Sequence, residues 1–128
     1  IAGTMTLAPA DANDKWYYKF TSVSNASTDL IAGYFTDYTA VDDDTAPTAV
    51  HTADKVKFIF IKNTDGSNDV YLVFDAGTAS TSVGDAIKVP AGTAWFGQLP
   101  NTTVAEVHAI SSTSTVNCLV AALIDDVA

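Results

Sequence analysis

The chain has 128 residues and a formal net charge of −9, with fifteen acidic residues and only six basic ones, all lysine. Because neutralisation of phosphates by basic residues dominates nucleic-acid affinity, this balance argues against a nucleic-acid partner, and it disfavours anionic membrane surfaces for the same reason. Hydrophobic residues make up 48% of the chain and charged residues only 16%, which excludes a disordered tail and predicts one folded domain with a low-charge surface that packs against neighbours.

The chain opens with a polar segment that leads into an aromatic strand. Residues 1–14 are small and polar, so we expect an N-terminal arm, either an interaction element or a loose terminus. They lack the charged and apolar stretches of a signal peptide. Residues 16–23 are rich in aromatic and β-branched types, which favours a β-strand. Alternation along this strand places Trp16, Tyr18 and Phe20 on one face and Tyr17, Lys19 and Thr21 on the other.

A less regular strand and a long loop are predicted next. Residues 28–35 could form a second strand, while residues 36–54 are polar and show no clear period. Long loops in compact domains tend to be functional or mobile. The acidic side chains of this loop gather within residues 37–44, where they are Asp37, Asp42, Asp43 and Asp44.

The clearest element of the sequence is a predicted hairpin over residues 55–76. Its first strand, residues 55–62, is apolar on both faces in its middle, which is typical of a strand buried on both sides. Asp65-Gly66 is a strong turn signal, and residues 70–74 are expected to return as the partner strand. The hairpin is therefore predicted to be scaffold, with its first strand inside a layered sheet.

The second half of the chain reads as short strands separated by turns. Strands are expected at residues 86–89, 94–99, 104–110 and 116–124, with breaks at Pro90-Ala91-Gly92 and Pro100-Asn101. The last segment also has helical spacing, but it lacks a helix cap and begins with a β-branched residue, which favours a strand. Seven or eight such strands predict an all-β fold, an antiparallel β-sandwich or jelly roll, with residues 15–128 forming a single domain.

No combination of residues indicates catalysis. Cys118 and His108 could act together only if they lay on neighbouring strands, and Cys118 lies in an apolar run where a thiol behaves as a small hydrophobic residue. Glu106 is the only Glu of the chain, so we expect it at a rim or opposite a lysine rather than in a carboxylate pair. The sequence therefore predicts that the protein is not an enzyme and has no catalytic or cofactor-binding residues.

Two polar stretches carry oxygen ligands of the kind that calcium prefers. One is the acidic part of the loop at residues 37–44, and the other holds Asn63, Asp65, Ser67 and Asp69 at alternate positions. The second stretch lacks a closing Glu and has the character of an ordinary polar loop. We expect solvated loops at both places, and hence no metal ion and no cofactor.

Several segments share their order and style with a known class of protein. An Ile-Lys-Asn strand end at residues 61–63 leads into a turn, and the next strand ends in Asp75-Ala76-Gly77. The Pro90-Ala91-Gly92 turn then precedes an aromatic pair, Trp95-Phe96. This arrangement, which covers about residues 55–124, resembles small β-sandwich virion proteins of tailed bacteriophages.

The resemblance implies a capsid decoration or cement protein in the virion. Such a protein binds the outside of the major capsid protein shell, often as a homotrimer, which would place this chain on the outer capsid surface. The arm at residues 1–14 and the loop at residues 36–54 are the expected contact elements. A tail, fibre or neck component is an alternative within the same class. A second alternative, suggested by the aromatic content, is an extracellular carbohydrate-binding or adhesin module.

Overall fold

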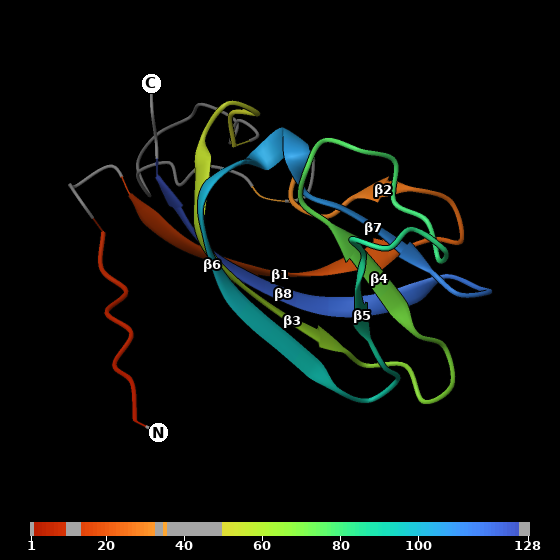
Figure 1. Cartoon of the computed structure of the whole chain (residues 1–128). Coiled ribbons are helices and arrows are strands. Elements are labelled where there is room, and N and C mark those ends of the chain that lie inside the picture. Colours follow the sequence, from red (N-terminus) through yellow and green to blue (C-terminus); the bar gives the residue numbers. More distant parts are fainter. Residues whose placement is uncertain (1, 10–13, 33–34, 36–49, 126–128) are drawn as a thin grey trace, which may run out of the picture.

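The computed structural model describes residues 2–9, 14–32, 35 and 50–125. Within these residues the chain forms eight strands and one short 3-10 helix, η1 (Figure 1). The strands are β1 (Lys15–Val23), β2 (Thr28–Asp29), β3 (Lys55–Asn63), β4 (Val70–Val73), β5 (Ile87–Val89), β6 (Ala94–Thr103), β7 (His108–Ser111) and β8 (Val116–Asp125), and η1 is Val104–Glu106.

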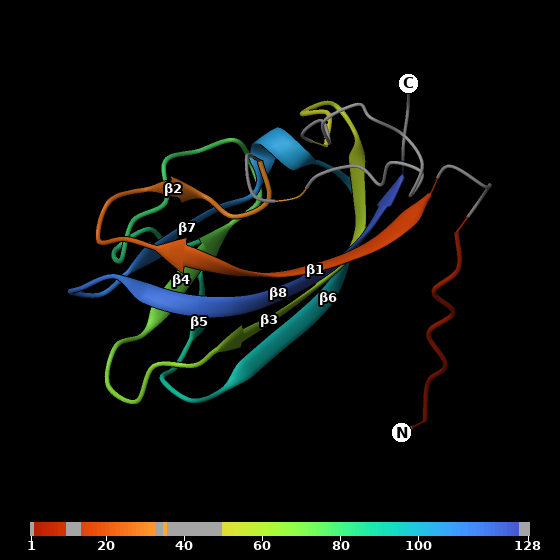
Figure 2. The same cartoon turned by 180° about the vertical axis from the view of Figure 1, so that it is seen from behind.

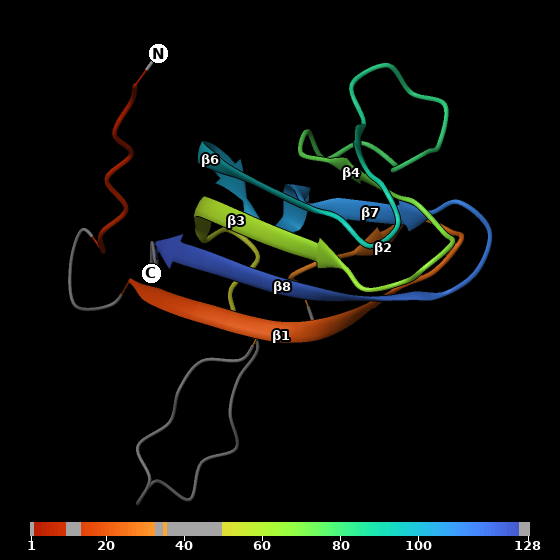
Figure 3. The same cartoon turned by 90° about the horizontal axis from the view of Figure 1, so that it is seen from below.

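The strands form two four-stranded antiparallel sheets. The larger sheet has the order β1-β8-β3-β6, which can be followed in Figure 3, and the smaller sheet has the order β2-β7-β4-β5. Figures 1 and 2 show the smaller sheet packed against one side of the larger one. This architecture confirms the predicted all-β antiparallel sandwich.

Alternating side chains of both sheets build the core between them. The larger sheet contributes Ile59 and Ile61 from β3 and Val120 from β8, all fully buried. The smaller sheet contributes Val70 and Leu72 from β4, which are also fully buried. Inner faces that interdigitate in this way are typical of a β-sandwich.

The expected strand at residues 116–124 is confirmed as β8, which lies between β1 and β3 in the larger sheet.

The predicted hairpin over residues 55–76 is wrong, because its two strands belong to different sheets. β3 pairs with β8 and β6, whereas β4 pairs with β5 and β7. The segment at residues 64–69 therefore crosses from one layer to the other. The connection between the two strands, residues 64–69, is not a tight two-residue turn. The two apolar strands face each other across the core and do not share a ladder.

Buried Asn63 anchors this crossing segment. Its side-chain amide donates hydrogen bonds to the carbonyl oxygens of Asn68 and Val89, at 2.8 and 3.2 Å. Its Oδ1 accepts a hydrogen bond from the backbone N–H of Asp65 at 3.0 Å. One side chain thus holds the start of the crossing, its end and the neighbouring strand β5.

Three further strand predictions need correction. The strand expected at residues 28–35 ends after Asp29, because the chain bends there to bury Leu30 and Ile31 in the core. The strand expected at residues 104–110 begins only at His108, since residues before it form η1. The strand expected at residues 94–99 continues to Thr103 as β6, although its pairing with β3 is broken near Pro100, where the register shifts and residues 99–101 have no partner on β3.

The long excursion after β2 leaves and rejoins the core at defined points. Phe35 and Val50 are buried, and the Val50 N–H donates to the Phe35 carbonyl oxygen at 3.0 Å. The backbone of Asp54 then accepts a hydrogen bond from Val104 at 2.9 Å. The acidic stretch expected at residues 37–44 lies outside the described residues.

We predict that Asn63→Ala lowers the free energy of unfolding by about 2–3 kcal/mol, because two carbonyl groups and one N–H lose a buried partner. Thermal or denaturant unfolding of the purified variant measures the effect. The matched control is Asn117→Ala, since the exposed Asn117 side chain makes one hydrogen bond, accepted from the Ser22 hydroxyl at 3.0 Å. We expect this control to change stability by less than about 0.5 kcal/mol. Equal effects of the two substitutions would contradict the anchoring role of Asn63.

Candidate functional site

The most prominent surface of the described structure is the outward side of the larger sheet, here called the aromatic face. Period-two alternation places outward the residues Trp16, Tyr18 and Phe20 of β1, Leu119, Ala121 and Leu123 of β8, Phe58, Phe60 and Lys62 of β3, and Ala94, Phe96 and Gln98 of β6. The smaller sheet covers only the opposite side of these strands. The aromatic face is thus apolar but faces away from the core.

Several aromatic side chains on this face are largely open to water. The exposed fractions are 42% for Trp16, 78% for Tyr18, 62% for Phe20 and 59% for Phe96. Aromatic side chains bring about 150–250 Å² each, so these four leave on the order of 500 Å² of aromatic surface in contact with water. The largest apolar patch of an ordinary monomer is about 300–600 Å² and is often functional.

Strand register arranges the aromatic face in three rows across the sheet. The rows are Trp16–Leu123–Phe58–Gln98, Tyr18–Ala121–Phe60–Phe96 and Phe20–Leu119–Lys62–Ala94. Phe58 links two of the rows, since its ring centroid lies 5.8 Å from that of Trp16 and 6.2 Å from that of Phe96. The rings therefore hold one another in place, which gives the face a fixed shape.

Charges are confined to the ends of the aromatic face. At one end Lys57 forms ion pairs with Asp14 at 2.8 Å and with Asp125 at 3.1 Å. The hydrogen bond to Asp14 is the main reason why the pKa of Lys57 is raised above its usual value. At the other end Lys62 donates to the Gly92 carbonyl oxygen at 2.5 Å. Between these ends the outward positions of the four strands hold no acidic side chain.

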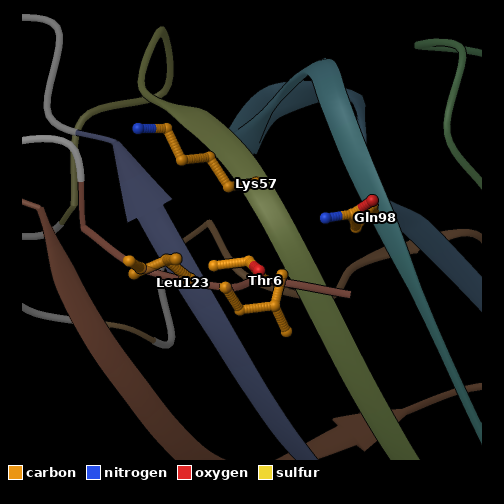
Figure 4. A pocket seen from close by; sticks show the side chains of 6 residues that line it. Thr6, Lys57, Gln98 and Leu123 are labelled. Atoms are coloured by element: carbon orange, nitrogen blue, oxygen red, sulfur yellow. The ribbon is translucent and has the colours of Figure 1, made fainter. Parts of the chain in front are cut away.

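The N-terminal segment touches this face at the Lys57 end. A pocket of about 240 Å³ is lined by Thr6, Leu7 and Ala8 from the segment and by Lys57, Gln98 and Leu123 from the sheet. Figure 4 shows Thr6 beside Leu123, with Lys57 and Gln98 on the neighbouring strands. Leu123 of the sheet is only 1% exposed. In the N-terminal segment itself, most of residues 2–9 are exposed. The segment therefore covers one corner of the aromatic face and leaves the aromatic rings open.

The side chains of β1 alternate between the two faces as predicted, but this alternation does not show which group is buried. Trp16, Tyr18 and Phe20 share one face as predicted, while Tyr17 on the opposite face stacks on Phe35 with ring centroids 5.6 Å apart. Likewise β3 is an inner strand, as predicted, but it is fully buried on one side only. Phe58 and Phe60 remain partly exposed. Period-two alternation reveals which residues share a face, and the position of the second sheet decides which face is covered.

Cys118 and His108 do not lie on neighbouring strands, the condition under which they could act together. Cys118 lies on β8 in the larger sheet, opposite Thr21 and Asn63. His108 lies on β7 in the smaller sheet, where its Nδ1 is 3.4 Å from Oδ1 of Asp29. The two residues are therefore on different sheets and not on neighbouring strands.

Glu106 has a structural partner in its own turn. Its carboxylate accepts a hydrogen bond from the Thr103 backbone N–H at 2.6 Å, which caps the start of η1. This hydrogen bond is the main cause that lowers the pKa of Glu106, and the charge of Lys55 lowers it further. The carboxylate thus fixes the turn before β7, which explains why the expected strand starts late.

The polar side chains of the crossing segment, which are of the type that calcium prefers, form hydrogen bonds and an ion pair with neighbouring residues. Oδ1 of Asp65 accepts hydrogen bonds from the backbone N–H groups of Ser67 and Asn68, both at 2.7 Å. The carboxylate of Asp69 pairs with Lys88 at 2.7 Å and accepts from the Ala91 N–H at 3.0 Å. Within the described residues no group of three or more His, Cys, Asp or Glu side chains is placed to hold a metal ion.

These loop carboxylates make stability depend on acidic pH. Lys88 holds the pKa of Asp69 below its usual value of 3.8, and the Asn68 N–H does the same for Asp65. A carboxyl whose pKa is lowered in the folded state stabilises the protein above its unfolded-state pKa, and this contribution is lost as pH falls through the folded-state pKa.

We predict a melting temperature that is steady near neutral pH and falls once the pH drops below about 4. Calorimetry across this range should show a shallower acid decline for Asp69→Asn than for the native sequence. Asp85→Asn, which removes the same charge from an exposed position, is the control and should keep the native slope. The same slope for both variants would contradict a structural role of Asp69.

The thiol of Cys118 should be chemically inert in the folded protein. The residue is fully buried, and burial raises the pKa of its thiol to about 12. Because the thiolate is the reactive form, we predict negligible reaction with a thiol reagent at mildly alkaline pH and full reaction after denaturation. Rapid labelling of the native protein would contradict the buried position.

Comparisons with known proteins give little beyond this geometry. No protein-family model and no curated protein matches the chain. Among solved structures, the chain is similar to one described as "Cyanophage Pam1 capsid asymmetric unit", with 14% sequence identity and a TM-score of 0.31 over 95% of this chain and 92% of that one. A TM-score this low establishes neither a common fold nor a common function. The described residues contain no helix with the length and apolar character of a membrane span.

Proposed function

We propose that this protein is a structural component of a tailed-phage virion, a capsid decoration or cement protein that binds the outside of the major capsid protein shell. Its role is to pack against other proteins, and it catalyses no reaction. The observation that carries the proposal is the aromatic face, an apolar side of the larger sheet whose aromatic rings the rest of the described chain leaves open. A folded domain that keeps Tyr18 and Phe20 in water is built to be covered by protein.

Two features of the sequence agree with this proposal. The segments from the Ile-Lys-Asn strand end to the Pro90-Ala91-Gly92 turn resemble small β-sandwich virion proteins. The net charge of −9, without any arginine, would be repelled by packaged DNA, so a position on the outside of the shell is expected.

The N-terminal segment is the proposed shell contact. Residues 2–9 form no strand, and no hydrogen bond joins their backbone to the rest of the described chain. Residues 6–8 line the corner pocket near Leu123. Extended segments of this kind can add to the sheet edge of another protein. The loop at residues 36–54 remains a second proposed contact element.

We predict that the protein binds expanded capsids of its phage in a co-sedimentation assay, and that deletion of residues 1–9 weakens binding by at least about tenfold, equal to about 1.4 kcal/mol. The deletion spares Asp14, the ion-pair partner of Lys57, so the melting temperature should change little. A folded deletion variant that binds as tightly as the full chain would remove the role of the arm. Absence of any binding by the full chain would contradict the proposed function.

A second candidate function is an extracellular carbohydrate-binding module. The specific observation in its favour is that Trp16 and Tyr18 lie exposed side by side on a sheet face, where sugar rings could stack. A glycan array distinguishes the two functions, because the virion proposal predicts no binding to any glycan. Binding to a defined sugar that Trp16→Ala abolishes would favour the second function.

A further inference from the structure

We propose that the N-terminal segment, residues 2–9, is a strap that covers part of the docking surface in the free protein and leaves it when the protein binds the shell. The corner beneath the strap, around Leu123, is then a hidden part of the aromatic face. The inference rests on the proposed function, because the shell protein is the partner that displaces the strap. Four features carry it: the burial of Leu123, the fixed root of the segment, its loose seat and the area of the open rings.

Leu123 is buried although it does not belong to the core. It occupies an outward position of β8 opposite Trp16, and it lies outside the cluster of buried residues between the sheets. The preceding outward residues of β8, Leu119 and Ala121, are partly exposed, whereas Leu123 is 1% exposed. All three lie opposite an aromatic residue of β1, and only Leu123 shares a pocket with residues 6–8 of the segment. The segment therefore accounts for the difference.

The root of the segment is fixed next to this corner. Lys57 lies at a β-bulge of β3, where the register shifts between Val56 and Phe58. A bulge of this kind re-aims a side chain, and Lys57 lines the same pocket as residues 6–8. Its ammonium group pairs at 2.8 Å with Asp14, whose side chain is fully buried. The segment can therefore leave the sheet while this ion pair keeps its root in place.

The seat of the segment is loose. Residues 2–9 share no backbone hydrogen bond with the rest of the described chain, and a pocket of about 240 Å³ is lined jointly by residues 6–8 and the sheet. Leu7 is the only member of residues 2–9 that is not exposed. The segment also has no charged side chain, so it can leave without breaking an ion pair. A partner that offers more apolar area than Leu7 can replace it.

The open rings supply only part of a stable interface. The four most exposed rings leave on the order of 500 Å² in contact with water, whereas a standard interface buries about 800 Å² on each partner. Leu123 lies in the first row of the face, between Trp16 and Phe58. Release of the strap uncovers this row and joins it to the open rings. The shell protein thus gains a continuous apolar surface once the strap has left.

Release of the strap couples the two proposed shell contacts. Residues 6–8 lie against Leu123 of β8, Lys57 of β3 and Gln98 of β6 (Figure 4), so the segment can reach the shell only after it leaves the sheet. The same event completes the aromatic face, and each contact therefore favours the other. In the free protein the strap keeps one corner of an exposed apolar patch out of water, which limits association away from the shell.

A reversible cross-link tests the strap. The variant Thr6→Cys, Gln98→Cys places two exposed thiols on opposite sides of the pocket, and Leu123 stays unchanged. A short bis-methanethiosulfonate reagent bridges the two thiols, and reduction releases them. The native Cys118 thiol does not react because it is buried. The matched control, Thr6→Ser, Gln98→Ser, has no thiols to bridge, and Ala8→Cys replaces Thr6→Cys if the first variant does not fold.

We expect the reagent to bridge the free protein readily and the capsid-bound protein slowly. In co-sedimentation, the bridged protein should bind expanded capsids at least about fivefold more weakly than the chain that lacks residues 1–9. The deletion removes only the segment, whereas the bridge also hides the Leu123 corner, and a central apolar contact is worth about that factor or more. Reduction should restore binding to the level of the unbridged variant, and the reagent should not affect the serine control.

Three results would overturn the strap while native capsid binding persists. A free protein that the reagent fails to bridge would show that the segment is not seated at this corner. Equal binding by the bridged and reduced forms would show that release is not required. Equal binding by the bridged form and the deletion would show that the Leu123 corner is not part of the docking surface. Absence of binding by the native chain would instead overturn the proposed function, and the strap with it.

Discussion

The larger sheet carries apolar side chains on both of its sides, and the second sheet of the sandwich can cover only one of them. Ile59 and Ile61 of β3 are fully buried toward the core, whereas Phe58 and Phe60 of the same strand point outward. Burial of apolar area is the dominant favourable term in both folding and association. The strands that build the core therefore also present the aromatic face. One side of the sheet is scaffold, and the other is the proposed binding surface.

Several polar side chains of the described chain hold its connecting segments in place. Asp65 and Asp69 bind backbone N–H groups in the segment between the sheets, and Glu106 caps the turn before β7. Asn63 anchors the same crossing segment from inside the core. These side chains hold the loops at both ends of the sandwich, so the sheet keeps a fixed shape. A fixed shape lowers the entropic cost of binding a complementary surface.

Most strands could be predicted from the sequence, but their pairing could not. Alternation and β-branched content located β1, β3 and β8, because these patterns depend on neighbouring residues alone. The hairpin of residues 55–76 was wrong because a turn signal such as Asp65-Gly66 shows where the chain reverses and not which sheet receives it. The aromatic face was missed for a related reason: the side-chain period groups Trp16, Tyr18 and Phe20 together, but only the position of the other sheet shows that they remain in water.

Hydroxyl-radical footprinting in the dilute protein and in the assembled particle shows whether the protein packs through its aromatic face. Tyr18, Phe20 and Phe96 should be readily oxidised in dilute solution, because more than half of the surface of each residue is exposed. In the assembled particle the same three residues should be strongly protected, while Tyr71 on the smaller sheet keeps its reactivity. Equal oxidation of Tyr18, Phe20 and Phe96 in both states would contradict the claim that this face is where the protein packs.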